Sequence, residues 1–253
     1  MALSVSDPED ADEATIAALD EVFLGLSSAL LEAGYGLTYG GDLRLRGFGD
    51  RLLKLAGSGG QGRIRIVLAP FVAELADADA LAAARDIAEI VVVDVTDPPA
   101  GLGEAACRAR ELAAMRRWVT DHTAARIVVG GRVLGSAGVA PGVLEEAYVS
   151  VSQRQPTIVL GGFGGVSELA ARAIAGEDVA VLSRVLDADS GYSRVTASLV
   201  EAGEPVATPA EMLRVLQDLA KGDASVGSSG LVLGSEPEDP VRSALDALRS
   251  RLT

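Results

Sequence analysis

Glu146 and Glu168 occupy equivalent places in two consecutive segments of the chain. Each lies in the first turns of a predicted helix that follows an apolar, β-branched run and a loop rich in glycine or other small residues. A carboxylate in such a place can stabilise or attack an oxocarbenium-like sugar, as in glycoside cleavage. It can equally accept hydrogen bonds from ribose hydroxyls. The structural alternative for each glutamate is that it complements the helix dipole or lies on a solvated helix face.

The turn before Glu168, Gly161-Gly162-Phe163-Gly164-Gly165, has four glycines in five residues, which is more than a strand-to-helix turn requires. Glycines let backbone N–H groups approach a ligand, and the N-terminal end of the next helix favours an anion. The spacing differs from the dinucleotide fingerprint GxGxxG, and the chain has no Gly-Lys-Ser/Thr of a P-loop. A bare turn without a ligand is the alternative.

Other loops after apolar runs carry glycines, small polar residues or arginines that could border the same site. These candidate ligand-binding residues are Ser6, Gly40, Gly41, Asp42, Arg44, Gly47, Gly131 and Arg132. An arginine beside a glycine turn fits a phosphate clamp, although most surface arginines are only solvated. Asp42 could bind a ribose hydroxyl or cap a turn.

These loops must meet at one edge of a sheet to form a site. Strands are predicted at residues 2–6, 36–39, 64–68, 90–95, 127–129 and 157–160, and most of these runs lack polar alternation, as expected for strands buried on both faces. Helices are predicted at residues 12–33, 50–56, 71–88, 104–120, 208–220 and 240–252, and after the two glycine-containing loops.

The alternation of strands and helices predicts an α/β fold with a doubly wound, mostly parallel sheet, helices on both faces and a C-terminal helical extension. In such sheets, ligands bind beyond the carboxyl ends of the strands, near the point where the strand order reverses. The loops after residues 6, 39, 129 and 160 are therefore expected to share one rim. Residues 221–253 are predicted to be a Gly/Ser-rich linker and a terminal helix, separate from a main domain of residues 1–220.

The net charge of −14 disfavours nucleic acids and anionic membranes as partners. One cysteine, Cys107, and one histidine, His122, cannot form an intrachain disulfide or a transition-metal site, so we predict no metal and no cofactor. No apolar run reaches the roughly 18 residues of a membrane span, and the first residues are acidic rather than typical of a signal peptide. We therefore expect a cytoplasmic protein.

Several motifs resemble those of the SLOG superfamily, over about residues 2–175. Tyr39-Gly40-Gly41 with Gly47-Phe48-Gly49 is similar to its YGG…GxxG loop, and residues 160–168 are similar to its PGGxGTxxE motif. Leu160 and Gly165 stand in place of the proline and the threonine of that motif. The superfamily includes the Lonely-Guy phosphoribohydrolases and nucleotide-sensing domains of bacterial conflict and defence systems. It implies a Rossmann-like nucleotide-binding domain that could form a homodimer.

The segment around Glu146 also resembles nucleoside deoxyribosyltransferases, in which the matching glutamate is the nucleophile. Together the resemblances imply that Glu146 and Glu168 face ribose, that Gly164, Gly165 and Arg116 lie near a phosphate, and that Gly142 borders the ligand. The implied function is a sensor that binds a small-molecule nucleotide derivative, ADP-ribose-like or cyclic. The alternative is an N-glycosidic hydrolase or transferase that uses Glu168 or Glu146. A scaffolding domain, in which the glycines only make turns, is the third possibility.

Overall fold

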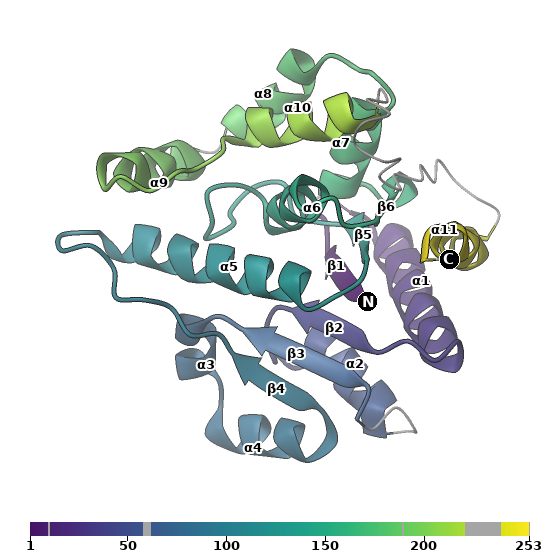
Figure 1. The fold of residues 1–253 in the computed structure, drawn as a ribbon. Helices are drawn as coiled ribbons and strands as arrows, with labels where there is room; N and C mark the ends of the chain where they lie inside the picture. Colours follow the sequence, from purple (N-terminus) through teal and green to yellow (C-terminus); the bar gives the residue numbers. More distant parts are fainter. Residues whose placement is uncertain (10, 58–61, 189, 221–238, 253) are drawn as a thin grey trace.

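A six-stranded parallel sheet forms the centre of the molecule (Figure 1). The computed structural model describes residues 1–9, 11–57, 62–188, 190–220 and 239–252. The strands are β1 (Ala2–Ser6), β2 (Leu37–Gly40), β3 (Ile64–Leu68), β4 (Glu89–Val92), β5 (Arg126–Gly130) and β6 (Thr157–Leu160). The prediction of an α/β fold with a doubly wound parallel sheet is confirmed.

Helices cover both faces of this sheet, as predicted. They are α1 (Glu13–Glu32), α2 (Phe48–Leu55), α3 (Pro70–Leu75), α4 (Ala78–Ile87), α5 (Glu104–Asp121), α6 (Gly142–Ser152), α7 (Gly165–Ile174), α8 (Val179–Asp187), α9 (Ser190–Glu201), α10 (Pro209–Ala220) and α11 (Pro240–Leu252). Helices α1, α2 and α11 pack on one face. Helices α5, α6 and α7 cover the other, and α8 to α10 form a further layer outside them (Figure 1).

The strand order β4-β3-β2-β1-β5-β6 reverses between β1 and β5. These two strands pair in parallel from Ala2 opposite Arg126 to Ser6 opposite Gly130. The loops that follow them therefore flank the topological switch point, where α/β sheets bind their ligands. Because β2, β1, β5 and β6 are neighbours, the four predicted loops do lie along one edge of the sheet.

The strand residues explain why two helix layers form. Ile127 and Val129 point to the α1 side of the sheet, and Val128 points to the α6 side. All three are buried, so β5 must be covered on both faces, and this accounts for its lack of polar alternation.

The prediction of a buried strand at residues 90–95 is wrong in its extent and in its environment. β4 spans Glu89–Val92 at the edge of the sheet, and Val92 is 40% exposed. An apolar, β-branched run predicts a strand, but whether that strand is central or at an edge depends on pairings elsewhere in the chain. The segment 71–88 also divides into α3 and α4, because Asp77 caps a new helix by accepting a hydrogen bond from the amide of Ala80 at 2.9 Å.

The C-terminal helix α11 packs on α1 (Figure 1). A Cβ added to Gly25 of α1 would lie 3.1 Å from the Cγ2 atom of Val241, so the glycine allows the two helices to approach closely. Residues 221–238, which contain the predicted Gly/Ser-rich linker at residues 222–230, lie outside the described residues. The division into residues 1–220 and 221–253 stays a prediction.

Among the described residues, α1 is the one helix long and apolar enough to cross a membrane by length and composition. Its residues Leu19, Phe23, Leu26 and Leu30 are buried against the sheet. Such burial is typical of a core helix in a soluble protein, whereas the cellular compartment stays a prediction.

Candidate functional site

A cleft of about 460 Å³ opens at the edge of the sheet where β1, β5 and β6 end. We call it the switch-point cleft. It is lined by Pro8, Glu9, Ala11, Asp12, Thr15, Val133, Gly162, Phe163, Gly164, Gly165, Glu168, Leu169, Arg172 and Val185. Five of the predicted site residues, from the glycine turn and the first turn of α7, therefore share this cleft.

The glycine turn takes a backbone conformation that requires glycine. Gly164 has φ 71° and ψ −169°, and Gly165 has φ 63°. A Cβ at Gly161 would lie 2.5 Å from the Cβ atom of Ala171, so that glycine serves packing. A Cβ at Gly164 would have no neighbour within 4 Å. No side chain caps α7, and the amide of Val166 donates to the carbonyl oxygen of Gly131 at 2.9 Å, so the other first-turn amides of α7 remain for solvent or a ligand.

Acidic side chains dominate the charge of the switch-point cleft. The side chain of Glu168 is 50% exposed and lies 3.6 Å from Arg172, whose guanidinium is also held by Glu177 at 2.6 Å. Asp12 caps α1 by accepting a hydrogen bond from the amide of Thr15 at 2.8 Å, and hydrogen bonding by the side chain and then the amide of Thr15 lowers the pKa of Asp12. With Glu9, three carboxylates face one arginine, so an anionic ligand here would depend on backbone amides.

Four consecutive amides after β5 point back to the loop after β1. Those of Gly131 and Arg132 donate to the carbonyl oxygen and the hydroxyl of Ser6, at 2.7 and 3.0 Å. Those of Val133 and Leu134 donate to the two carboxylate oxygens of Glu9, at 2.7 and 2.6 Å. The hydroxyl of Ser6 and the backbone amide of Arg132 therefore join the two switch-point loops. Arg132 does not line the cleft.

The loop from Gly131 to Pro141 is also held from α9. The hydroxyl of Tyr192 donates to the carbonyl of Val133 at 2.9 Å and accepts from the amide of Ser136 at 3.3 Å. Tyr192 is buried, so these hydrogen bonds attach the loop that contains Val133, a cleft-lining residue, to α9 in the outer helix layer.

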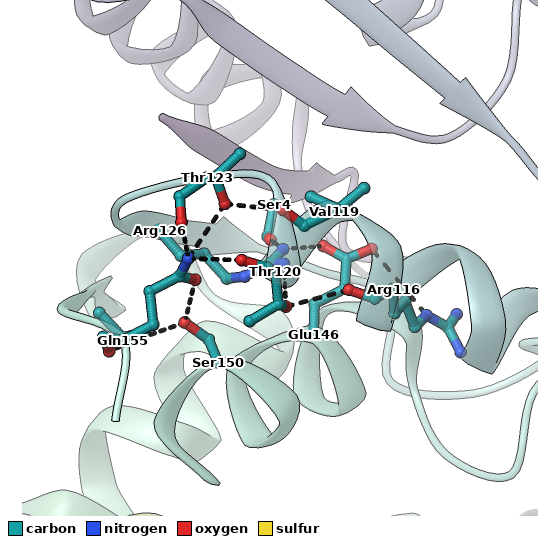
Figure 2. Close-up of polar contacts among 10 residues, drawn as sticks. Ser4, Arg116, Val119, Thr120, Thr123, Arg126, Glu146, Ser150 and Gln155 are labelled. Carbon is teal, nitrogen blue, oxygen red and sulfur yellow. Dashed lines mark hydrogen bonds and ion pairs between the residues drawn. The ribbon is translucent and has the colours of Figure 1, made fainter. Parts of the chain in front are cut away.

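Beyond this loop lies a buried group of charged and polar side chains (Figure 2). Arg126 is 1% exposed and donates to Ser4 Oγ at 2.6 Å, to Thr120 Oγ1 at 2.9 Å and to Glu146 Oε2 at 3.2 Å. Arg116 pairs with Glu145. The two arginines and two glutamates balance in charge, as buried ions must.

Burial sets the pKa values in this group. It lowers the pKa of Arg126, against the effect of the neighbouring Glu146 carboxylate. It raises the pKa of Glu145, against the effect of the Arg116 guanidinium. The Nε atoms of both arginines are buried and have no hydrogen-bond partner among the described residues.

The structure does not bring Glu146 and Glu168 into one pocket. Glu146 is 7% exposed and lines none of the three clefts described here. Glu168 is the fourth residue of α7, but Glu146 is the fifth of α6. One residue turns a side chain about 100° around a helix, and Glu146 therefore faces Arg126. Glu145 holds the fourth position, and it lines a separate cleft of about 490 Å³ between α5, α6 and residues 204–207.

Arg116 and Gly142 also lie away from the switch-point cleft. Arg116 is buried on α5. A Cβ at Gly142 would lie 2.9 Å from the Nη2 atom of Arg116, so this glycine makes room for the guanidinium. A phosphate could reach Arg116 only if the residues that bury its guanidinium moved.

The loop after β2 folds on itself. Asp42 accepts hydrogen bonds from the amide and the Nε atom of Arg44, at 3.1 and 2.6 Å, so it caps a turn. A Cβ at Gly47 would lie 3.0 Å from the carbonyl oxygen of Arg44, and the amide of Gly41 donates to Val67. Asp42 and Arg44 line a largely apolar cleft of about 950 Å³ beside α2, α3 and α4, not the switch-point cleft. Gly40 packs on Met115 of α5.

The sequence analysis did not identify three residues that shape this region: Glu9, Tyr192 and Arg126. Only Arg126 could have been noticed from the sequence, because it is a charged residue at the start of an apolar strand. Metal binding has no support in the described part of the chain, where no three His, Cys, Asp or Glu side chains gather as ligands.

The sequence matches a family model. A family model described as SLOG cluster2 covers residues 1–231, which include the whole sheet and the switch-point cleft. No curated protein matches the chain. The family match associates the chain with functions that involve nucleotide derivatives.

Proposed function

The chain belongs to the SLOG superfamily, and on that premise we propose that it binds a nucleotide derivative, ADP-ribose-like or cyclic, as a sensor. The supporting observation is a cleft at the topological switch point that is bordered by the open face of Gly164. The backbone conformation of Gly164 requires glycine with or without a ligand, but its open face leaves room for a ligand beside the start of α7.

Each part of such a ligand has a partner in the cleft. The half-exposed carboxylate of Glu168 can accept hydrogen bonds from ribose hydroxyls. The first-turn amides of α7, apart from that of Val166, can hold a phosphate. Val133, Leu169 and Val185 offer an apolar wall to a base. A cytoplasmic location, a homodimer and a role in conflict or defence systems remain predictions from the sequence.

A panel of nucleotides should raise the melting temperature with at least one member. A ligand at about 100 times its Kd adds about 2.7 kcal/mol to the free energy of unfolding. Gly164→Ala should abolish that response in folded protein, since alanine avoids this backbone conformation at a cost of about 1–3 kcal/mol. Gly176→Ala is the matched control, because Gly176 also has a positive φ but lies outside the cleft. No response from the unsubstituted protein to any nucleotide would refute the proposal.

The second candidate is an N-glycosidic hydrolase or transferase, favoured by the position of Glu168 in the cleft. Incubation with nucleoside 5′-phosphates would then release free base. Glu168→Gln should slow that release at least about a hundredfold, because a neutral amide can neither attack nor stabilise the sugar cation. Glu177→Gln, which changes the other partner of Arg172 outside the cleft, is the control. Equal release by the unsubstituted protein and the Glu168→Gln variant would exclude Glu168 from the chemistry.

A further inference from the structure

Glu9 places a carboxylate on two adjacent backbone amides at the switch point. Its Oε2 atom accepts from Val133 at 2.7 Å and its Oε1 atom from Leu134 at 2.6 Å. Such charge-assisted bonds are stronger than neutral ones. A ligand oxyanion with two oxygens on one atom, such as a carboxylate or a phosphate, could accept hydrogen bonds from the same two backbone amides in the same way.

The amides that receive Glu9 are fixed by the fold. Gly130 and Gly131 both have positive φ, and after them the chain presents its amides to the loop after β1. Tyr192 holds the same stretch from the other side through the carbonyl of Val133. The two amides therefore keep their direction whether or not Glu9 is present.

Glu9 itself is free to leave. Glu9 is exposed, and it belongs to the six-residue connection, residues 7–12, between β1 and α1. The carboxylate lines the same cleft as Gly164, Gly165 and Glu168. A ligand anion in this cleft would meet the carboxylate of Glu9 and compete for its two amides.

We propose that Glu9 is a built-in substitute for the anionic group of the ligand. On binding, a phosphate or carboxylate of the ligand takes the amides of Val133 and Leu134, and the Glu9 side chain turns to solvent. This inference rests on the proposed function and specifies its ligand as one with an oxyanion of two or more free oxygens. Without ligand, Glu9 satisfies the two amides. It also sets a threshold for binding, because weakly charged compounds do not displace it.

The structural alternative is that Glu9 only clamps the two loops together. Calorimetric titration with inorganic pyrophosphate at constant ionic strength distinguishes the two roles. If Glu9 is a displaceable substitute, the Glu9→Ala variant should bind pyrophosphate at least about tenfold more tightly than the unsubstituted protein. The affinity of the Glu9→Gln variant should fall between the two, because a neutral side-chain amide binds the amides of Val133 and Leu134 less strongly than a carboxylate does.

Glu13→Ala is the matched control. It removes an exposed carboxylate from the first turn of α1 that does not line the cleft, and it should change the affinity less than about twofold. Equal tightening by Glu9→Ala and Glu13→Ala would overturn the inference, since it would reflect general charge. So would Glu9 variants that stay folded, by circular dichroism, and bind no more tightly. If Glu9→Ala binds pyrophosphate more tightly but the protein responds to no nucleotide, the role of Glu9 at the amides of Val133 and Leu134 is supported and only the proposed nucleotide function is refuted.

Discussion

Replacing Arg126 with methionine is expected to lower the free energy of unfolding by about 3–5 kcal/mol. The guanidinium is buried and binds Ser4, Thr120 and Glu146. Methionine fills much of the same space but leaves the carboxylate of Glu146 without its closest cation and two hydroxyls without their donor. Urea denaturation should show the loss as a lower midpoint with an unchanged slope.

Arg132→Met is the matched control, because it makes the same chemical change in an exposed arginine. It should alter the free energy of unfolding by less than about 0.5 kcal/mol. The double variant Arg126→Met, Glu146→Gln should recover part of the loss, since it no longer buries an unpaired charge. A loss below about 1 kcal/mol for Arg126→Met alone would show that Glu146 has another adequate partner.

Most of the strands could be predicted because they are buried and rich in Val, Ile and Leu. Their order in the sheet could not be predicted in the same way, and β4 shows the consequence. Its run of valines resembles that of β5, yet β4 lies at the edge of the sheet and β5 lies between β1 and β6. Helices α8 and α9, which lie between Gly176 and the predicted helix at residues 208–220, also escaped prediction.

The candidate site was predictable where a rule links sequence position to the edge of the sheet. The glycine turn and Glu168 lie there, because they immediately follow β6. Glu146 was misplaced because the start of α6 could not be located to the residue, and a shift by one position turns a helical side chain from the rim to the core. The contact between Glu9 and Val133 left no pattern at all, since it joins residues 124 positions apart.

Gly165→Ala is expected to destabilise the protein by about 1–3 kcal/mol more than Gly176→Ala. Both glycines have positive φ, at 63° and 96°, so alanine meets a comparable backbone penalty at each. The difference is space. At Gly176 the added Cβ has no neighbour within 4 Å, but at Gly165 it would overlap the carbonyl oxygen of Gly131 and lie 3.1 Å from Pro8.

The overlap at Gly165 occurs where the loops after β1, β5 and β6 meet, because the amide of Val166 donates to the same carbonyl of Gly131 at 2.9 Å. Relief of the overlap requires these loops to separate, and the wall of the switch-point cleft would open with them. Gly165→Ala should therefore lose nucleotide binding as well as stability, whereas Gly176→Ala should keep the binding. Equal free energies of unfolding for the two variants, measured by urea denaturation, would mean that the loops part at little cost and that the cleft is not held rigid by this contact.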